Sequence, residues 1–130
     1  MKVLLVDDHA ICNLISQRTL ERLGIAQEIH TALNGAEAIN LFNKYFQGSQ
    51  SLPDVILLDL NMPVMDGFEF LEAFKKLPLP NKEKLQIIIV TSSVNEEDMH
   101  KARRLGVTQY LNKPVSPDQL KKALYSNQEN

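Results

Sequence analysis

Residues 3–8 read Val-Leu-Leu-Val-Asp-Asp, a continuous apolar run that ends on two acidic residues. The same pattern returns at residues 55–59, which read Val-Ile-Leu-Leu-Asp, and at residues 87–91, which read Ile-Ile-Ile-Val-Thr. Short apolar runs without alternating polar residues are typical of parallel strands that are buried on both faces. These three runs therefore predict the central strands of an α/β fold.

Two further stretches, residues 28–33 and 108–111, also favour strands but are more polar, which indicates the edges of the sheet. Apolar residues at helical spacing fill the intervals between the strands. The expected helices cover residues 11–23, 36–46, 68–74, 94–105 and a stretch that begins at 117. This alternation predicts an α/β fold with a single doubly wound, five-stranded parallel sheet that is flanked by five helices.

The first expected helix carries four apolar residues at helical spacing, namely Ile11, Leu14, Ile15 and Leu23. We expect this helix to cover the sheet, although which of its residues enter the core stays unassigned. The single cysteine of the chain, Cys12, lies in the same stretch. It excludes an internal disulfide and is expected to pack in the core.

The chain has 130 residues, of which 44% are hydrophobic, and this size suits one compact domain. We assign residues 1–125 to the domain and residues 126–130 to a short polar tail. The stretch at residues 47–53 is polar and is therefore expected to be a loop. It is too short to link two domains.

The formal net charge is −2, and the basic residues are spread along the chain. This distribution gives no electrostatic footprint for nucleic acid or for an anionic membrane surface. The N-terminal residues lead directly into the first strand, with neither a signal peptide nor an apolar run long enough to span a membrane. We therefore expect a cytoplasmic protein that neither binds nucleic acid nor inserts into a membrane.

Acidic residues follow two of the predicted central strands. Asp7 and Asp8 come directly after the first strand, and Asp59 comes directly after the third. In doubly wound sheets, ligands bind outside the carboxyl ends of the strands, so these side chains are expected to converge. Crowded carboxylates favour a hard divalent cation, and Mg²⁺ prefers oxygen ligands. A metal site is therefore predicted.

A carboxylate beside such a metal can accept a phosphoryl group covalently, and Asp59 is the candidate nucleophile. Thr91, at the end of the fourth strand, and Lys113 offer a hydroxyl group and a cation for the phosphoryl oxygens. Together these residues predict a phosphoryl switch. The sequence leaves open whether the bond between Lys113 and Pro114 is cis.

Four motifs in order make the chain resemble the receiver domain of two-component response regulators over nearly its whole length. They are Val6-Asp7-Asp8, Leu57-Leu58-Asp59-Leu60-Asn61-Met62-Pro63-Val64-Met65-Asp66-Gly67, Val90-Thr91-Ser92 and Tyr110-Leu111-Asn112-Lys113-Pro114. The resemblance implies a flavodoxin-like sheet with strand order 2-1-3-4-5. It also implies a stand-alone, single-domain regulator similar to a chemotaxis regulator.

The resemblance also implies roles for the acidic residues. Asp59 accepts the phosphoryl group. Asp8, Asp59 and the main-chain carbonyl of Asn61 bind Mg²⁺ or Mn²⁺ directly, and Asp7 supports the metal through water.

For the residues on the last two strands, the resemblance implies contacts with the phosphoryl group by Thr91 and Lys113. Thr91 and Tyr110 form the conformational switch. The implied partners are a sensor histidine kinase or a histidine phosphotransfer protein as donor, and a downstream protein that the sequence does not identify. Such a chain assists its own phosphorylation and dephosphorylation but is not an enzyme that turns over an external substrate.

Three alternatives stay open at the level of sequence. The chain could pass its phosphoryl group onward as a relay, or serve as an unphosphorylated scaffold. A Mg²⁺-dependent aspartyl-phosphate phosphatase of the haloacid dehalogenase type uses similar groups. Such enzymes usually place a second Asp where this chain has Asn61, and they usually need a cap domain that 130 residues do not accommodate.

Of the three histidines, only His9 suggests a role, as a metal ligand or a phosphohistidine, and we do not favour it. His9 follows the acidic pair, and we interpret it as a polar loop residue because Mg²⁺ prefers oxygen to imidazole. His30 and His100 have no His or Cys partner at metal-ligand spacing.

Overall fold

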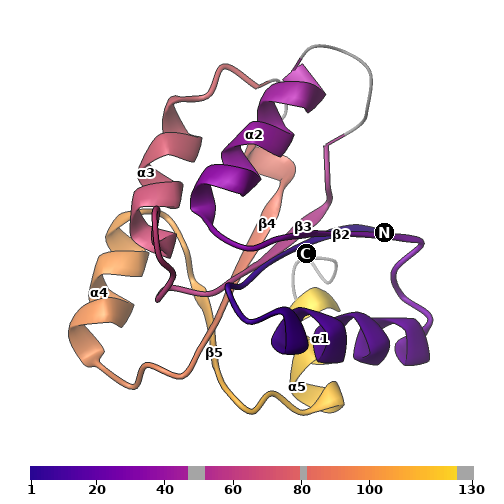
Figure 1. Ribbon diagram of the computed structural model, residues 1–130. Coiled ribbons are helices and arrows are strands. Elements are labelled where there is room, and N and C mark those ends of the chain that lie inside the picture. The colour runs from indigo at the N-terminus through magenta and orange to yellow at the C-terminus, as the bar shows by residue number, and fades with distance from the viewer. Residues whose placement is uncertain (47–51, 80–81, 126–130) are drawn as a thin grey trace.

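The computed structural model describes residues 1–46, 52–79 and 82–125 (Figure 1). Helices and strands alternate along these residues. In chain order they are β1 (Lys2–Val6), α1 (Ala10–Leu23), β2 (Glu28–Ala32), α2 (Gly35–Phe46), β3 (Val55–Leu58), α3 (Gly67–Lys76), a short 3₁₀ helix (Lys82–Lys84), β4 (Gln86–Thr91), α4 (Glu96–Arg104), β5 (Gln109–Asn112) and α5 (Pro117–Tyr125). The predicted tail, 126–130, and most of the predicted loop at 47–53 lie outside the described residues.

All strand pairs are parallel, and the strand order is β2-β1-β3-β4-β5. The predicted five-stranded α/β sheet and its order are therefore confirmed. The two more polar strands, β2 and β5, lie at the edges as expected, and the apolar strands β1, β3 and β4 form the centre. The central strands can be continuous apolar runs because both of their faces are covered.

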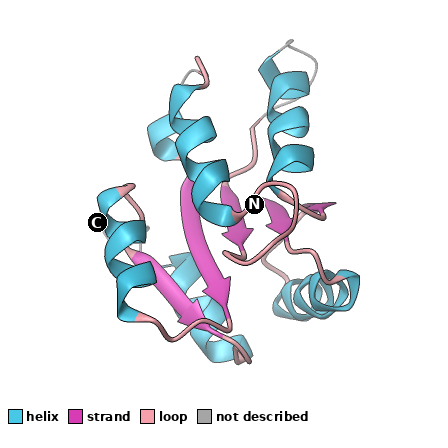
Figure 2. Ribbon diagram, turned by 60° about the vertical axis from the view of Figure 1, so that its left-hand side comes forward, coloured by secondary structure: helices cyan, strands magenta, loops and turns pink. Residues whose placement is uncertain are grey.

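Helices cover both faces of the sheet (Figures 1 and 2). Leu4 and Val6 of β1 point into a core that includes residues of α2, α3 and α4, whereas Val3 and Leu5 point into a second core with α1 and α5. This division follows from the alternation of side chains along a strand. The residues at the strand ends are thus held between two packed layers.

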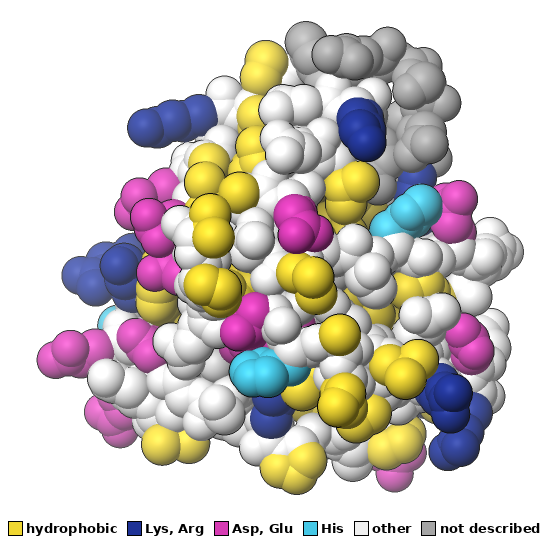
Figure 3. Space-filling model, viewed as in Figure 1, with side chains coloured by type: hydrophobic (Ala, Val, Ile, Leu, Met, Phe, Trp, Pro, Cys, Tyr) yellow, Lys and Arg dark blue, Asp and Glu magenta, His cyan; other side chains and the backbone are white. Residues whose placement is uncertain are grey.

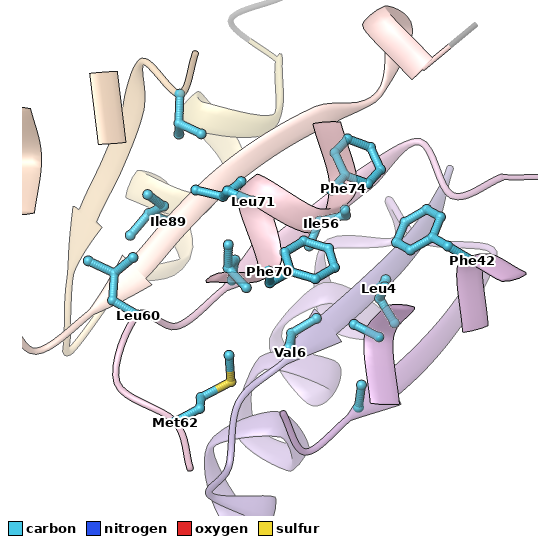
Figure 4. Close-up of a cluster of buried hydrophobic side chains, with 14 of the residues drawn as sticks. Leu4, Val6, Phe42, Ile56, Leu60, Met62, Phe70, Leu71, Phe74 and Ile89 are labelled. Carbon is cyan, nitrogen blue, oxygen red and sulfur yellow. The ribbon is translucent and has the colours of Figure 1, made fainter. Parts of the chain in front are cut away.

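The larger core contains three phenylalanine rings, from Phe42 on α2 and from Phe70 and Phe74 on α3 (Figure 4). Their ring centroids lie 5.1 to 6.2 Å apart, a separation typical of favourable aromatic pairs. They fix α2 against α3, which follows the loop after β3.

Helix α1 covers the sheet as expected, but three of the four apolar residues that marked it do not face the core. Ile11, Leu14 and Ile15 are 72%, 46% and 59% exposed. The buried residues of α1 are Asn13 and Leu20, which lie two helical turns apart and so share one face. The polar Asn13 therefore faces the sheet, whereas Ile11, Leu14 and Ile15 lie on faces of the helix that are open to solvent.

The exposed apolar side chains of α1 contribute to a hydrophobic area at the lower right of the face shown in Figure 3. Cys12 is half-buried rather than packed in the core, so that expectation is wrong. Within the described residues, no helix has the length and apolar character needed to cross a membrane.

The loop after β3 is anchored at the start of α3. Asp66 accepts a hydrogen bond from the Glu69 amide at 2.8 Å, and Glu69 accepts one from the Asp66 amide at 3.1 Å, which forms a capping box. The amide of Gly67 donates to the carbonyl of Leu60 at 2.9 Å. This contact draws the helix start against the residues that directly follow β3.

Gly67 is needed for this close approach. A Cβ atom added there would lie 2.6 Å from the carbonyl oxygen of Asp59 and 2.9 Å from the Cα of Leu60, and neither backbone atom can rotate away. We predict that Gly67→Ala lowers the free energy of unfolding by about 1–3 kcal/mol, as overpacking does. Helix propensity alone predicts the opposite, a gain of about 0.5–1 kcal/mol. Urea denaturation measures the sign, with the exposed Glu72→Ala on α3 as the control; a stabilised Gly67→Ala protein would contradict the steric account.

Candidate functional site

Hydrogen bonds of the sheet type continue past the ends of β1 and β3. The amide of Asp7 donates to the carbonyl of Ala32 at 3.1 Å, and the amide of Asp59 donates to the carbonyl of Val6 at 2.9 Å. The register pairs Val6 with Leu58, so both strands end at the same level. Asp7 and Asp59 are therefore held at the same edge of the sheet, as the sequence predicts.

The acidic side chains meet there in one cluster. Ligand atoms of Asp7, Asp8, His9 and Asp59 all lie within 4.8 Å of one another. Asp7 and Asp59 are only 7% and 5% exposed, so their charges are poorly hydrated. Because like charges at this separation repel strongly in a buried site, the cluster needs positive charge nearby.

One cation from the described residues supplies part of that charge. The Lys113 Nζ lies 2.6 Å from Oδ2 of Asp7 and 3.6 Å from Oδ2 of Asp59. Its main-chain amide donates to the carbonyl of Thr91 at 2.8 Å, which places Lys113 directly beyond the ends of β4 and β5. The peptide bond to Pro114, which the sequence left open, is cis.

Thr91 and Tyr110 lie on the same side of the site and are linked through Ser93. Thr91 is fully buried, and its Oγ1 accepts a hydrogen bond from the Ser93 amide at 3.3 Å. The Tyr110 hydroxyl donates to the Ser93 carbonyl at 3.3 Å. The Ser93 hydroxyl donates to Asp98 on α4 at 2.7 Å, so this link reaches that helix. Sequence reasoning did not find Ser93 as the connecting residue, because its partners lie on other elements.

The surroundings shift the pKa values of both central groups. Burial raises the pKa of the Asp59 carboxyl group, and the charge of Asp7 adds to this effect. Lys113 and hydrogen bonds from Thr91 and the main chain of Asn61 act in the opposite direction without cancelling it. For Lys113, burial acts to lower the pKa, but the hydrogen bond to Asp7 and the charge of Asp59 outweigh it and raise the pKa.

The donor set fits a hard divalent cation. Oδ1 of Asp8 is buried and accepts no hydrogen bond within the described chain, although His9 Nδ1 lies 3.2 Å away. An orphaned carboxylate oxygen is costly unless a cation or water satisfies it. Three carboxylates beside a single ammonium leave the cluster with excess negative charge, which a divalent ion would neutralise. Asn61 is exposed beside this pocket, two residues after Asp59.

Sequence reasoning did not predict that Asn13 of α1 is buried and contacts Asp7. Its side-chain amide donates to the main-chain carbonyl of Asp7 at 3.0 Å. The amide of His9 donates to Oδ1 of Asp7 at 2.9 Å. These two contacts fix the backbone and the side chain of Asp7. No signal in the sequence distinguishes Asn13 from an ordinary polar residue on a helix surface.

The raised pKa of Asp59 has a direct consequence for stability. A carboxyl group whose folded-state pKa exceeds its unfolded value favours folding below the unfolded pKa and loses this contribution as the pH rises through the folded pKa. Ionised Asp59 therefore destabilises the metal-free protein at neutral pH. We predict that Asp59→Asn raises the midpoint of thermal unfolding at pH 7 in EDTA, and that the difference shrinks as the pH falls toward the ordinary Asp value of 3.8.

The exposed Asp118→Asn on α5 is the control for this measurement and should change the midpoint little at either pH. An Asp59→Asn protein that is less stable than the wild type at neutral pH would show that the attraction between Asp59 and Lys113 exceeds the cost of burying the carboxylate.

Curated proteins with similar sequences carry signalling names. The chain is 32% identical over 125 residues to the probable methanogenesis regulatory protein FilR2 of Methanothrix harundinacea. The aligned region covers 94% of this chain and 77% of that protein. It is 35% identical over 119 residues to the sensor histidine kinase CheAY of Helicobacter pylori. That aligned region covers 91% of this chain but 14% of the kinase. The similar region is thus a small part of some relatives and most of others.

Solved structures of response regulators also resemble this chain in fold. A two-component response regulator from Cytophaga hutchinsonii superposes with a TM-score of 0.87 at 28% identity, covering 99% of this chain and 97% of the other. The phosphorylated cyanobacterial phytochrome response regulator RcpA gives a TM-score of 0.77 at 29% identity, covering 98% and 91%. Residues 3–125 match the family model of the response regulator receiver domain. The chain belongs to the response regulator receiver domain family.

Proposed function

We propose that this receiver domain accepts a phosphoryl group on Asp59 and signals through the change in protein contacts that follows. The observation that carries the proposal is the buried Asp59 carboxylate, which lies in one cluster with Asp7 and Asp8 and 3.6 Å from the Lys113 ammonium. The phosphorylated state of RcpA, a similar protein, supports it.

The reaction is an in-line displacement at phosphorus. An oxygen of Asp59 forms a bond to the phosphorus atom of a phosphohistidine, the P–N bond breaks, and its electron pair leaves with the imidazole of the donor. Burial favours this role, because a poorly hydrated carboxylate has few water contacts to lose before it attacks. Hydrolysis of the acyl phosphate restores the carboxylate and ends the signal.

Asp8, Asp59 and the main-chain carbonyl of Asn61 would hold Mg²⁺ or Mn²⁺ directly, with Asp7 contributing through water. The ion would neutralise charge on the phosphoryl oxygens and so orient the phosphorus atom for attack by Asp59. Asp7 would also orient Lys113, since its Oδ2 lies 2.6 Å from Nζ. Asn13 and the amide of His9 hold Asp7 in place for both tasks.

Lys113 and Thr91 would stabilise the phosphoryl group once it is attached. The Lys113 ammonium, which now lies near the Asp59 carboxylate, can pair with a phosphoryl oxygen once Asp59 is phosphorylated. The buried Thr91 hydroxyl can donate a hydrogen bond to a second phosphoryl oxygen. A change in the hydrogen bonding of Thr91 would reach Tyr110 and α4 through Ser93. Thr91 and Tyr110 would therefore act as the switch that alters the surface around α4 and β5.

The exposed apolar side chains of α1 support a protein as the phosphoryl donor. Ile11, Leu14 and Ile15 lie on the helix that starts beside the acidic cluster, and their exposure leaves an apolar surface for a partner (Figure 3). The sensor histidine kinase CheAY, part of which is similar to this chain, supports a histidine kinase or phosphotransfer protein as that donor. The net charge of −2 supports a protein rather than nucleic acid as the target, and we place both partners in the cytoplasm.

Phosphorylation is tested by intact-protein mass after incubation with acetyl phosphate and Mg²⁺. We predict a gain of about 80 mass units, one phosphoryl group, in the wild type. EDTA should prevent the gain, because no cation then neutralises the crowded charges. Asp59→Asn should also prevent it, while the exposed Asp118→Asn control keeps it. An adduct that persists in Asp59→Asn would contradict the assignment of the acceptor.

The switch is tested with beryllofluoride and Mg²⁺, which mimic a phosphoryl group on a carboxylate without turning over. We predict that NMR signals of Thr91, Ser93 and Tyr110 shift in the wild type, because the Thr91 hydroxyl exchanges its partner. Thr91→Ala should bind the mimic but leave the Tyr110 signals nearly unchanged. Equal Tyr110 shifts in both proteins would contradict a switch that acts through Thr91.

A further inference from the structure

Two side chains beside the acidic cluster differ in chemistry from the rest of the site. Cys12 on the first turn of α1 and His9 just before this helix offer sulfur and nitrogen. A ligand atom from each lies within 4.8 Å of the other and of a carboxylate oxygen of Asp7. Mg²⁺ has little affinity for sulfur or nitrogen, so the proposed phosphorylation chemistry leaves both side chains unused.

The distances suit a tetrahedral metal. Nδ1 of His9 lies 3.4 Å from Oδ1 of Asp7. Bonds of about 2.0–2.2 Å from zinc to nitrogen and oxygen place two ligand atoms of a tetrahedral site about 3.3–3.5 Å apart. The His9 and Asp7 atoms therefore already have the required separation. A zinc–sulfur bond of about 2.3 Å places the sulfur about 3.6 Å from the nitrogen and oxygen ligands. Because the Cys12 sulfur lies within 4.8 Å of both, each distance must shorten by at most about 1.2 Å.

The Cys12 thiol is accessible to a metal. Cys12 is half-buried and lines a cavity of about 420 Å³ between α1 and the start of α5, together with Ile15, Lys113 and Val115. His9 is exposed, with 68% of its side chain open to solvent. A metal can therefore reach both ligands without unfolding the helix, and both side chains have room to adjust.

The charge of the site also favours a cation. Asp7, Asp8 and Asp59 carry three negative charges, against which Lys113 sets one positive charge. Lys113 pairs with Oδ2 of Asp7, whereas His9 faces Oδ1, so a metal on Oδ1 need not displace the ammonium. The buried Oδ1 of Asp8 lies 3.2 Å from the same His9 nitrogen and adds negative charge beside the site.

We propose that Asp7, His9 and Cys12 form a binding site for a borderline divalent transition metal of the Zn²⁺ class. The sulfur and nitrogen ligands of this site take no part in the proposed phosphorylation, whereas Asp7 belongs to both sites. It shares Asp7 with the acidic cluster, and a metal on it would lie against Asp8. Occupation of the site by Zn²⁺ would engage Asp7 and therefore oppose binding of Mg²⁺ in the cluster.

Cobalt titration of the full chain, reduced and free of Mg²⁺, tests the proposal. Co²⁺ replaces Zn²⁺ in tetrahedral sites, and a bond to thiolate gives a sulfur-to-cobalt charge-transfer band in the near ultraviolet, which carboxylates and imidazole do not produce. We predict this band at one Co²⁺ per chain, together with its loss when Zn²⁺ is added. A band that saturates at one metal per two chains would overturn a site within one chain.

Variants assign the ligands. Cys12→Ser should abolish the charge-transfer band, and His9→Gln should weaken Co²⁺ binding by about tenfold or more. The exposed His100→Gln on α4 should leave both unchanged. Circular dichroism confirms that each variant is folded, and because His9 is exposed its replacement leaves the core intact. Co²⁺ binding without the band in wild type, or a band that survives in Cys12→Ser, would overturn the proposal.

Discussion

Repulsion among three buried or half-buried carboxylates is the constraint on which this receiver domain depends. Asp7, Asp8 and Asp59 share one cluster, and of the described cations only Lys113 is paired with it. Such a cluster is maintained only because the rest of the fold holds it. Its excess negative charge makes the pocket receptive to a divalent ion. Burial raises the pKa of Asp59, and the charge of Asp7 adds to this effect.

The sheet supplies the rigidity that this crowding requires. Asp7 and Asp59 follow buried strands directly and still donate main-chain hydrogen bonds to neighbouring strands. Two packed cores hold those strands from both faces, and Gly67 allows α3 to start against the backbone of Asp59. The repulsive energy of the site is thus offset by packing several residues away, as is common where charged groups are gathered for function.

Much of the fold and part of the site follow from the sequence. Continuous apolar runs require burial on both faces, and their carboxyl ends must share an edge, which explains why Asp7, Asp59 and Thr91 could be predicted together. The strand order came from resemblance. The sequence does not reveal how α1 is rotated about its axis against the sheet, which decides that Asn13 faces inward and that the apolar side chains are exposed. It also does not reveal the contacts of Ser93, because these depend on how separate elements pack together.

Mg²⁺ dependence of the free energy of unfolding tests most directly the claim that the crowded carboxylates form a cation site. The account predicts that stability rises with Mg²⁺, by about 2.7 kcal/mol when the free ion is about 100 times its dissociation constant. Asp8→Asn should lose this rise, whereas Asp118→Asn should keep it. A free energy of unfolding that stays constant from EDTA to millimolar Mg²⁺ would contradict the account.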